Sequence, residues 1–214
     1  MPETRVFWRF RLPHWEVADC PHFVTIRSAD SLPADALARV RAVHESLQLI
    51  APSSPQFASL QRKYFLLCEQ YLDAGHGLCP FLEPAVSELA MASLADLSTR
   101  QGWRVPHFTL MPNHVHLLLA PGRGAQPLKQ TIRGSKWFVA TQANRLLGRT
   151  GPFWQTDWFD RWARTEAEAG RMRDYIRLNP AKPDLPCSGK TTVGPAANPT
   201  RFPSRNRSAI TRSA

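Results

Sequence analysis

The chain has 214 residues, 43% of them hydrophobic and 21% charged, and a formal net charge of +10. This composition is typical of globular proteins and excludes disorder throughout, and the length allows one decorated domain or two small ones. No apolar run approaches a membrane helix, the first residues lack the apolar core of a secretory signal, and the four cysteines form no C-x-x-C pair, so we expect a reduced, cytoplasmic protein without a zinc knuckle.

Residues 1–100 are predicted to form one strand followed by helices. The strand is the β-rich run His22–Arg27. Apolar residues then recur at helical spacing, and breaks rich in Pro, Ser and Gly at 51–55 and 75–77 divide them into separate helices. The helices are expected from Pro33 onward, over 57–72 and over 84–99. They are amphipathic and carry no functional signal of their own.

Strands and helices alternate in the second half. Trp103–Met111 and residues 114–120 are predicted to form an antiparallel hairpin, because the turn dipeptide Pro112-Asn113 joins them. The elements expected after this hairpin are a helix over 126–147 with Gly148 as its C-cap, a strand over 158–163, and a helix from Thr165 to about Leu178. This order favours an α+β sandwich with helices on one face of the sheet.

Positive charge is confined to the second half of the chain. Residues 1–100 carry 9 Lys and Arg against 11 Asp and Glu, a net charge of −2, whereas residues 101–214 carry 18 against 6, a net charge of +12. That half also holds five of the seven tryptophans. Cations bind phosphates and flat rings stack on unpaired bases, so the pattern favours a nucleic-acid partner. Merely solvated charges, membrane surfaces and acidic proteins stay open as alternatives.

The pattern His114-Val115-His116 stands at the start of the second strand of the predicted hairpin. Alternate residues of a strand share a face, so the two imidazoles can converge on one metal ion. Two imidazoles leave coordination positions open, which metal-assisted chemistry on a substrate requires. Two histidines also flank a valine on ordinary strands, but here a turn precedes the pair and three leucines follow it. The pair is therefore expected at the mouth of a buried strand.

Arg171, Tyr175 and Asn179 form one stripe along the last predicted helix, at i, i+4 and i+8. A tyrosine hydroxyl is a nucleophile for phosphorus or carbon, but its ordinary pKa of about 10 requires a metal or a base at neutral pH. The carboxamide oxygen of Asn179 suits a hard ion such as Mg²⁺ or Mn²⁺. On the helix alone, a packing role for Tyr175 is the main alternative, because it lies at the margin of the apolar stripe.

Basic and aromatic side chains suggest where nucleic acid binds. Lys129, Arg133 and Lys136 fall on one face of the predicted helix over 126–147, although this face also suits a merely solvated helix. Trp154 is either a base-stacking or a core residue, and two arginines follow the aromatic residues around it. The predicted DNA contacts are Lys129, Arg133, Lys136, Trp154, Arg161, Arg164 and Arg171.

Several segments together resemble the HUH single-tyrosine transposases, and specifically the REP-associated tyrosine transposases of bacteria. The most specific part is Met-Pro-Asn-His-Val-His at 111–116 followed by Tyr-Ile-x-x-Asn-Pro at 175–180. The other matching segments are His22–Arg27, Ser135-Lys136, and residues 148–155 and 158–161. They stand in the family's order over roughly residues 20–183. The chain departs from the family after Pro180, where Ala-Lys-Pro-Asp-Leu replaces a stretch of small residues.

The resemblance implies an α+β fold with a ferredoxin-like core, in which helices pack on a central antiparallel sheet. It implies one domain over residues 1–183, with a helical insertion at 30–100, and a disordered basic tail over 184–214. The tail is also expected from composition, because it contains almost nothing to bury. The implied setting is the bacterial cytoplasm at the nucleoid, without a membrane partner.

The resemblance also implies the chemistry. His114 and His116 would bind a divalent cation, Mg²⁺ or Mn²⁺, with Asn179 as third ligand, and Tyr175 would be the nucleophile. Family members cleave single-stranded DNA that carries a foldback hairpin, and the tyrosine stays joined to the 5′-phosphate until strand transfer. Two alternatives remain open: a domesticated, non-catalytic DNA-binding protein acting at repeats, and a metal-binding or RNA-acting module of another kind. Monomer and homodimer are both compatible with the sequence.

Overall fold

The computed structural model describes residues 2–181, 192 and 193. The strands are β1 (Thr4–Arg9), β2 (Pro13–Val17), β3 (His22–Arg27), β4 (Trp103–Met111), β5 (His114–Pro121), β6 (Phe159–Trp162) and β7 (Thr192–Val193). The α-helices are α1 (Ala34–Leu49), α2 (Pro55–Asp73), α3 (Pro84–Thr99), α4 (Leu128–Leu146) and α5 (Glu166–Leu178). Two short 3₁₀ turns are η1 (Pro80–Leu82) and η2 (Asn179–Ala181). The predicted elements therefore exist, with ends shifted by one or two residues.

The main sheet has the strand order β6-β3-β5-β4-β7, and every neighbouring pair is antiparallel. Along the chain, its four longer strands follow the order β3-α3-β4-β5-α4-β6, so β3 and β5 lie at the centre. This arrangement is the ferredoxin-like topology, and the expected fold class is confirmed. The central position of β5 is what buries the histidine pair at its start.

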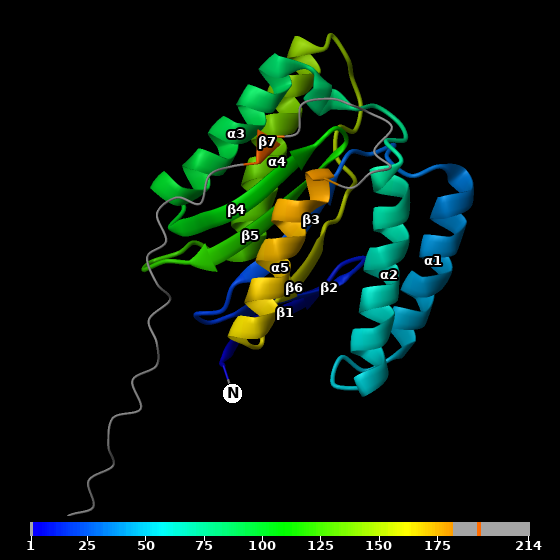
Figure 1. Cartoon of the computed structure of the whole chain (residues 1–214), viewed down its shortest axis with the longest axis vertical. Helices are drawn as coiled ribbons and strands as arrows, with labels where there is room; N and C mark the ends of the chain where they lie inside the picture. The colour runs from blue at the N-terminus through cyan, green and yellow to red at the C-terminus, as the bar shows by residue number, and fades with distance from the viewer. Residues whose placement is uncertain (1, 182–191, 194–214) are drawn as a thin grey trace, which may run out of the picture.

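Helices cover both faces of this sheet, not one face as the element order suggested (Figure 1). Successive strand residues point to opposite sides. Val24, Ile26, Val115 and Leu117 point toward α3 and α4, where they form the main core. The other face carries Phe23 and the two histidines and lies beneath α5, whose Ile176 is fully buried there. The second layer exists because α5 has an apolar stripe of its own to bury.

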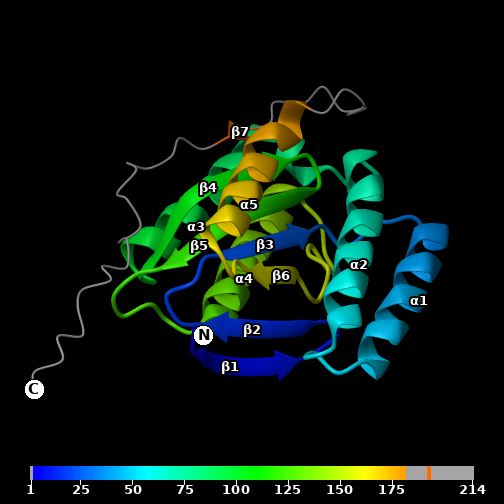
Figure 2. The same cartoon turned by 60° about the horizontal axis from the view of Figure 1, so that its bottom comes forward.

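The helical stretch over 30–100 divides into two parts in the structure. α1 and α2 lie side by side next to the sheet and share a small core of their own (Figure 2). α3 instead packs on the sheet together with α4, as the first crossover helix of the ferredoxin-like order. Only α1 and α2 therefore stand outside that order, and they bring the side chains of α2 to the face of the sheet that carries the histidines.

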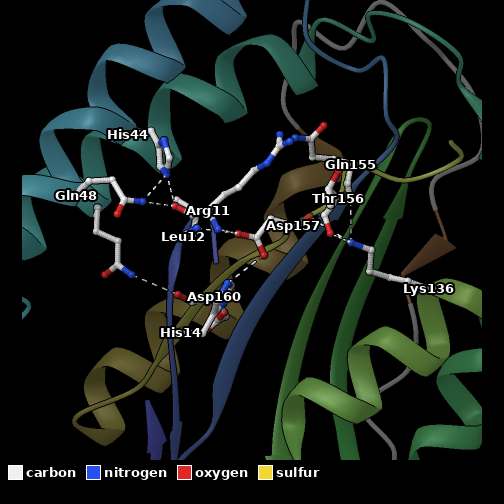
Figure 3. Close-up of polar contacts among 11 residues, drawn as sticks. Arg11, Leu12, His14, His44, Gln48, Lys136, Gln155, Thr156, Asp157 and Asp160 are labelled. Atoms are coloured by element: carbon white, nitrogen blue, oxygen red, sulfur yellow. Dashed lines mark hydrogen bonds and ion pairs between the residues drawn. The ribbon is translucent and has the colours of Figure 1, made fainter. Parts of the chain in front are cut away.

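The hairpin of β1 and β2 was not predicted, because β1 is almost entirely exposed and shows no apolar alternation. A buried polar network holds β2 in place (Figure 3). His14, with no exposed surface, bonds Asp157 through Nε2 at 3.0 Å and Asp160 through Nδ1. Asp157 also accepts from the backbone N–H of Leu12 at 2.7 Å. One charged cluster thus ties the hairpin to β6 and the loop before it.

Most of the tail predicted over 184–214 lies outside the described residues. Within it, the backbone of Thr192–Val193 forms a short edge strand against β4. Across the described ranges, no helix combines the length and the apolar character needed to cross a membrane.

Candidate metal centre and tyrosine

The two histidines stand side by side on β5 and are completely buried. Their Nε2 atoms lie 3.1 Å apart. The Pro112-Asn113 turn starts β5 immediately before the pair, and the register places His116 between Thr25 of β3 and Thr109 of β4. The expectation that both imidazoles share one face and converge is met by this geometry.

Each imidazole is oriented through its other nitrogen. The Nδ1 of His114 lies 2.8 Å from Oδ1 of Asn113, and the Nδ1 of His116 lies 2.8 Å from Oγ1 of Thr25. A carboxamide oxygen only accepts, so His114 carries its proton on Nδ1 and keeps the Nε2 lone pair. Asn113 is itself fixed, because its Nδ2 donates to the carbonyl of His76 at 3.0 Å. Such partners are typical of histidines that bind metals.

Glu69 of α2 completes the cluster, and its role was not predicted. Its Oε2 lies 3.2 Å from Nε2 of His116, and the ligand atoms of Glu69, His114 and His116 all fall within 4.8 Å of one another. Separations of 3.1 and 3.2 Å are close to the ~3.0 Å between neighbouring ligands held at ~2.1 Å around an octahedral ion. The other Glu69 oxygen is buried and has no hydrogen-bond partner in the described part of the chain. These residues fit a divalent cation.

Tyr175 of α5 reaches the same cluster and donates its hydroxyl hydrogen to Oε2 of Glu69. Its ring lies 5.4 Å from that of His116, centroid to centroid. Burial raises the pKa of Tyr175, the charge of Glu69 raises it further, and the Asn179 carboxamide acts in the opposite direction. Burial would also raise the pKa of Glu69, but His116, His114 and the Tyr175 hydroxyl together outweigh it and lower that pKa to about 2. The pair is therefore a neutral phenol on an ionised carboxylate.

Asn179 caps α5 one turn after Tyr175, and its backbone N–H donates to the Tyr175 carbonyl. Its side chain is 1% exposed, and neither its oxygen nor its nitrogen has a hydrogen-bond partner among the residues described. Buried amides are rarely left without partners, so an unsatisfied one calls for an explanation such as a bound ion or water. Glu69 of the cluster and Asn179 each keep a buried oxygen without a hydrogen-bond donor among the described residues.

A signal for Glu69 is present in the sequence, although it is weak. The buried residues of α2 are Phe57, Gln61, Cys68, Glu69 and Leu72. Glu69 therefore stands on the inward face of an amphipathic helix, where an acidic residue is buried only if it is paired or binds a metal. Periodicity identifies that anomaly, but not the partner that explains it.

The predicted DNA contacts on α4 separate into outward and inward residues. Lys129 and Arg133 are exposed, and they line a groove along α4 together with Trp137, which is 70% exposed. Lys136 points inward, and its Nζ donates to the carbonyls of Gln155, Thr156 and Asp157 at 2.7–3.3 Å (Figure 3). Burial lowers the pKa of Lys136 to about 8.

The other predicted contacts lie around β6 and α5. Trp154 packs against Phe81 and donates its indole N–H to the backbone of Lys136, so its ring belongs to the core. Arg161 pairs with Glu168 at 2.6 Å, and the guanidinium of Arg164 lies 5.0 Å from the ring centre of Trp162. Arg171 is exposed and lines a cavity beside Tyr175. The predicted contacts thus form two groups, one on α4 and one near the tyrosine.

No protein family matches the chain in sequence, and no curated protein matches it either. Among solved structures, the chain is similar to one described as the REP-associated tyrosine transposase bound to a REP hairpin. The similarity covers 85% of this chain and 73% of that chain, with 14% sequence identity and a TM-score of 0.42. A likeness of this degree assigns no residue a role, so the roles of Glu69, His114 and Tyr175 depend on this chain's own geometry.

Proposed function

We propose that the protein is a metal-dependent single-stranded DNA endonuclease and strand transferase that uses Tyr175 as its nucleophile. One observation carries the proposal: the hydroxyl of Tyr175 meets a buried carboxylate that also contacts one of two convergent imidazoles. A packing tyrosine also needs a hydrogen-bond partner when buried, but not one that contacts a pair of convergent imidazoles. A phenol beside a group of potential metal ligands suits attack on a phosphodiester, whose charge must be neutralised before an anionic nucleophile can approach.

His114, His116 and Glu69 are the residues proposed to hold the cation, with Asn179 as a further oxygen ligand. When bound, a Mg²⁺ or Mn²⁺ ion supplies positive charge beside the phenol and a Lewis acid for a non-bridging phosphate oxygen. Imidazole and carboxylate together suit Mn²⁺, whereas an added carboxamide also suits Mg²⁺. The Nδ1 contacts of both histidines fix the orientation of their rings, so that the two Nε2 atoms face the same point.

The protein's own residues account for the rest of the proposed reaction. Glu69 accepts the phenolic hydrogen bond and so holds the Tyr175 oxygen in one position. That oxygen bonds to phosphorus as the bond from phosphorus to the 3′-oxygen breaks, and the proton lost by the phenol balances the one gained by the leaving 3′-hydroxyl. The 5′-phosphate then stays on Tyr175, and a new 3′-hydroxyl reverses the step to complete strand transfer.

DNA binding is proposed for the exposed cations and not for Lys136. Lys129 and Arg133 line one groove on α4 with Trp137, so phosphates and an unstacked base can be held together there. This groove belongs to the helical layer opposite the tyrosine. We propose that it holds the hairpin-bearing part of the DNA, while the strand to be cut reaches Tyr175 on the other side of the sheet.

The test is formation of a covalent adduct on a denaturing gel. Purified protein is mixed with single-stranded hairpins from the DNA that flanks its own gene, labelled at either end, with Mn²⁺, Mg²⁺ or EDTA. We expect a metal-dependent shifted band that carries the 3′-end label only, because the tyrosine keeps the 5′-phosphate of the downstream fragment. The band should be absent in Tyr175→Phe and present in the matched control Tyr71→Phe, which changes a different tyrosine, on α2.

Other outcomes separate the alternatives. Tight hairpin binding without an adduct in any metal would support the non-catalytic DNA-binding protein, in which the neutral Tyr175 stays on Glu69. Binding of the corresponding RNA hairpin in preference to DNA would support an RNA-acting module. An adduct that survives in Tyr175→Phe would remove Tyr175 from the reaction.

A further inference from the structure

A cavity of about 290 Å³ opens beside Tyr175, between α2 and α5. Four aromatic rings line it, those of Phe23, Phe65, Phe159 and Tyr175. The ring centres of Phe65 and Phe159 lie 4.9 Å apart, and those of Phe65 and Tyr175 lie 5.5 Å apart. This volume is at the small end of the range for ligand sites, which suits one planar group and excludes a duplex.

The charged side chains around the cavity are mostly positive, and the acid among them is already paired. Arg62 and Arg171 line it and are exposed, on α2 and α5 respectively. The acid that lines it, Glu168, is engaged by Arg161 at 2.6 Å and by the backbone N–H of Arg164 at 2.8 Å. A negative ligand at the rim therefore meets two guanidinium groups and no uncommitted carboxylate among the lining residues.

We propose that this cavity binds the unpaired base next to the phosphate that Tyr175 attacks. The base would stack against Phe65 and Phe159, and Arg62 and Arg171 would bind the phosphates that flank it. Flat apolar walls with cations at the rim match a nucleotide of a single strand, whose base is free to leave the stack. Because Tyr175 lines the same cavity, a base held there brings the neighbouring phosphate toward the hydroxyl.

The proposal deepens the proposed function and rests on it for the identity of the strand. It also gives α2 a role in binding the DNA strand, besides supplying Glu69. α2 lies outside the ferredoxin-like order, yet it supplies Glu69 to the metal ligands and Phe65 and Arg62 to the cavity. Substrate choice at the cleavage point would then depend on this helix.

The test uses no metal, so that binding is measured without cleavage. Wild-type protein in EDTA is titrated against two fluorescently labelled octamers, oligo-dT and a fully abasic strand with the same phosphates. We expect oligo-dT to bind about tenfold more tightly, the size of a stacked base. Phe65→Leu should remove most of this ratio, whereas Arg171→Gln should weaken both octamers and leave the ratio intact. The matched control Phe138→Leu, an exposed phenylalanine of α4, should change neither quantity.

Photocrosslinking of the wild-type protein provides a measurement that no folding defect can mimic. An octamer with 5-iodouracil at every position should crosslink to Phe65, Phe159 or Tyr175. An unchanged ratio in folded Phe65→Leu, crosslinks confined to α4, or tighter binding of oligo-rU would each overturn the proposal. If an adduct forms on the denaturing gel but Phe65→Leu keeps the wild-type ratio of oligo-dT to abasic affinity, only the proposal for the cavity is refuted. If Phe65→Leu loses that ratio but wild type forms no adduct, only the proposal of cleavage is refuted.

Discussion

The described part of the protein contains two buried clusters of histidine and carboxylate, and they differ in where the imidazole nitrogens point. In the first, both nitrogens of His14 face carboxylates, Asp157 and Asp160. In the second, the Nδ1 atoms of His114 and His116 face neutral groups, and both Nε2 atoms face each other and Glu69. The first imidazole faces a carboxylate at each nitrogen and has no nitrogen left for a metal, whereas the second pair directs both Nε2 atoms, together with Glu69, to one point.

The carboxylate partners of His14 also determine its charge. Burial lowers the pKa of His14, but the two aspartates outweigh it and raise that pKa to about 9. His14 is therefore a cation between two anions, and it holds the β1–β2 hairpin to the sheet. The histidines of both clusters are fully buried, so burial does not distinguish a structural histidine from a proposed metal ligand. The partners of the ring nitrogens make that distinction.

The largest expected stability effect separates the two clusters. His14→Gln removes the cation between two buried carboxylates and is expected to cost about 3–5 kcal/mol of unfolding free energy. His114→Gln leaves only the neutral Asn113 to satisfy and is expected to cost about 1 kcal/mol, while abolishing the metal-dependent adduct. Urea unfolding of both variants and the denaturing gel measure the two effects. Equal stability losses would contradict the division into a structural and a metal-binding cluster.

Replacing Glu69 tests the second cluster directly. Glu69→Gln keeps the shape of the side chain and removes its charge, so Mn²⁺ affinity is expected to fall about 10–100-fold. The same change should lower the pKa of Tyr175, because the Glu69 charge helps to raise it. Calorimetric titration with Mn²⁺ measures the affinity, and ultraviolet absorbance from pH 8 to 12 follows the phenol. Glu88→Gln, which changes an exposed acid of α3, is the matched control, and an equal loss there would remove Glu69 from the ligand set.

The parts of the site that the sequence predicts are those carried by local pattern. Strand alternation is sufficient to place His114 and His116 on one face, and helical spacing places Tyr175 and Asn179 one turn apart. Glu69 is different, because it reaches the histidines only after α2 folds back against the sheet, 45 residues earlier in the chain than His114. Periodicity predicts which face of α2 is buried, but not which other element it is buried against.

The same limit explains the other differences. β1 is exposed and β2 is held by His14, so the hairpin depends on Asp157 and Asp160, about 145 residues further on. Lys129 and Lys136 share a helix face in the sequence pattern, but the loop after α4 folds over the second and not the first. The α+β class was predictable from the order of strands and helices, whereas the ferredoxin-like core was expected from the resemblance alone and the second helical layer was not predicted.

A smaller effect tests the charge state of His14. A group whose pKa is raised on folding stabilises the protein fully below its unfolded pKa of 6.5, and this contribution is lost as pH rises through about 9. The pKa of Lys136 is lowered to about 8, so loss of its buried charge raises the free energy of unfolding only as pH approaches and passes 8. Burial also lowers the pKa of His22 and of His107, so each adds a rise of up to about 0.4 kcal/mol over this range. Between pH 6.5 and 8 the free energy of unfolding should therefore fall by about 1 kcal/mol. Urea unfolding at pH 6.5, 7.2 and 8 measures the fall, and a flat profile in wild type would contradict a protonated His14.

The smallest expected effect concerns the two lysines of α4. Lys129 is exposed near the ring of Trp8, whereas Lys136 is committed to three carbonyls. Lys129→Ala should therefore reduce the slope of log affinity against log salt for a DNA hairpin by about one unit. Lys136→Met should leave the slope unchanged and lower stability by about 1–3 kcal/mol, because three carbonyls lose their donor. Fluorescence anisotropy at four salt concentrations distinguishes them, and a reduced slope for Lys136→Met alone would mean that this lysine leaves the loop to bind phosphate.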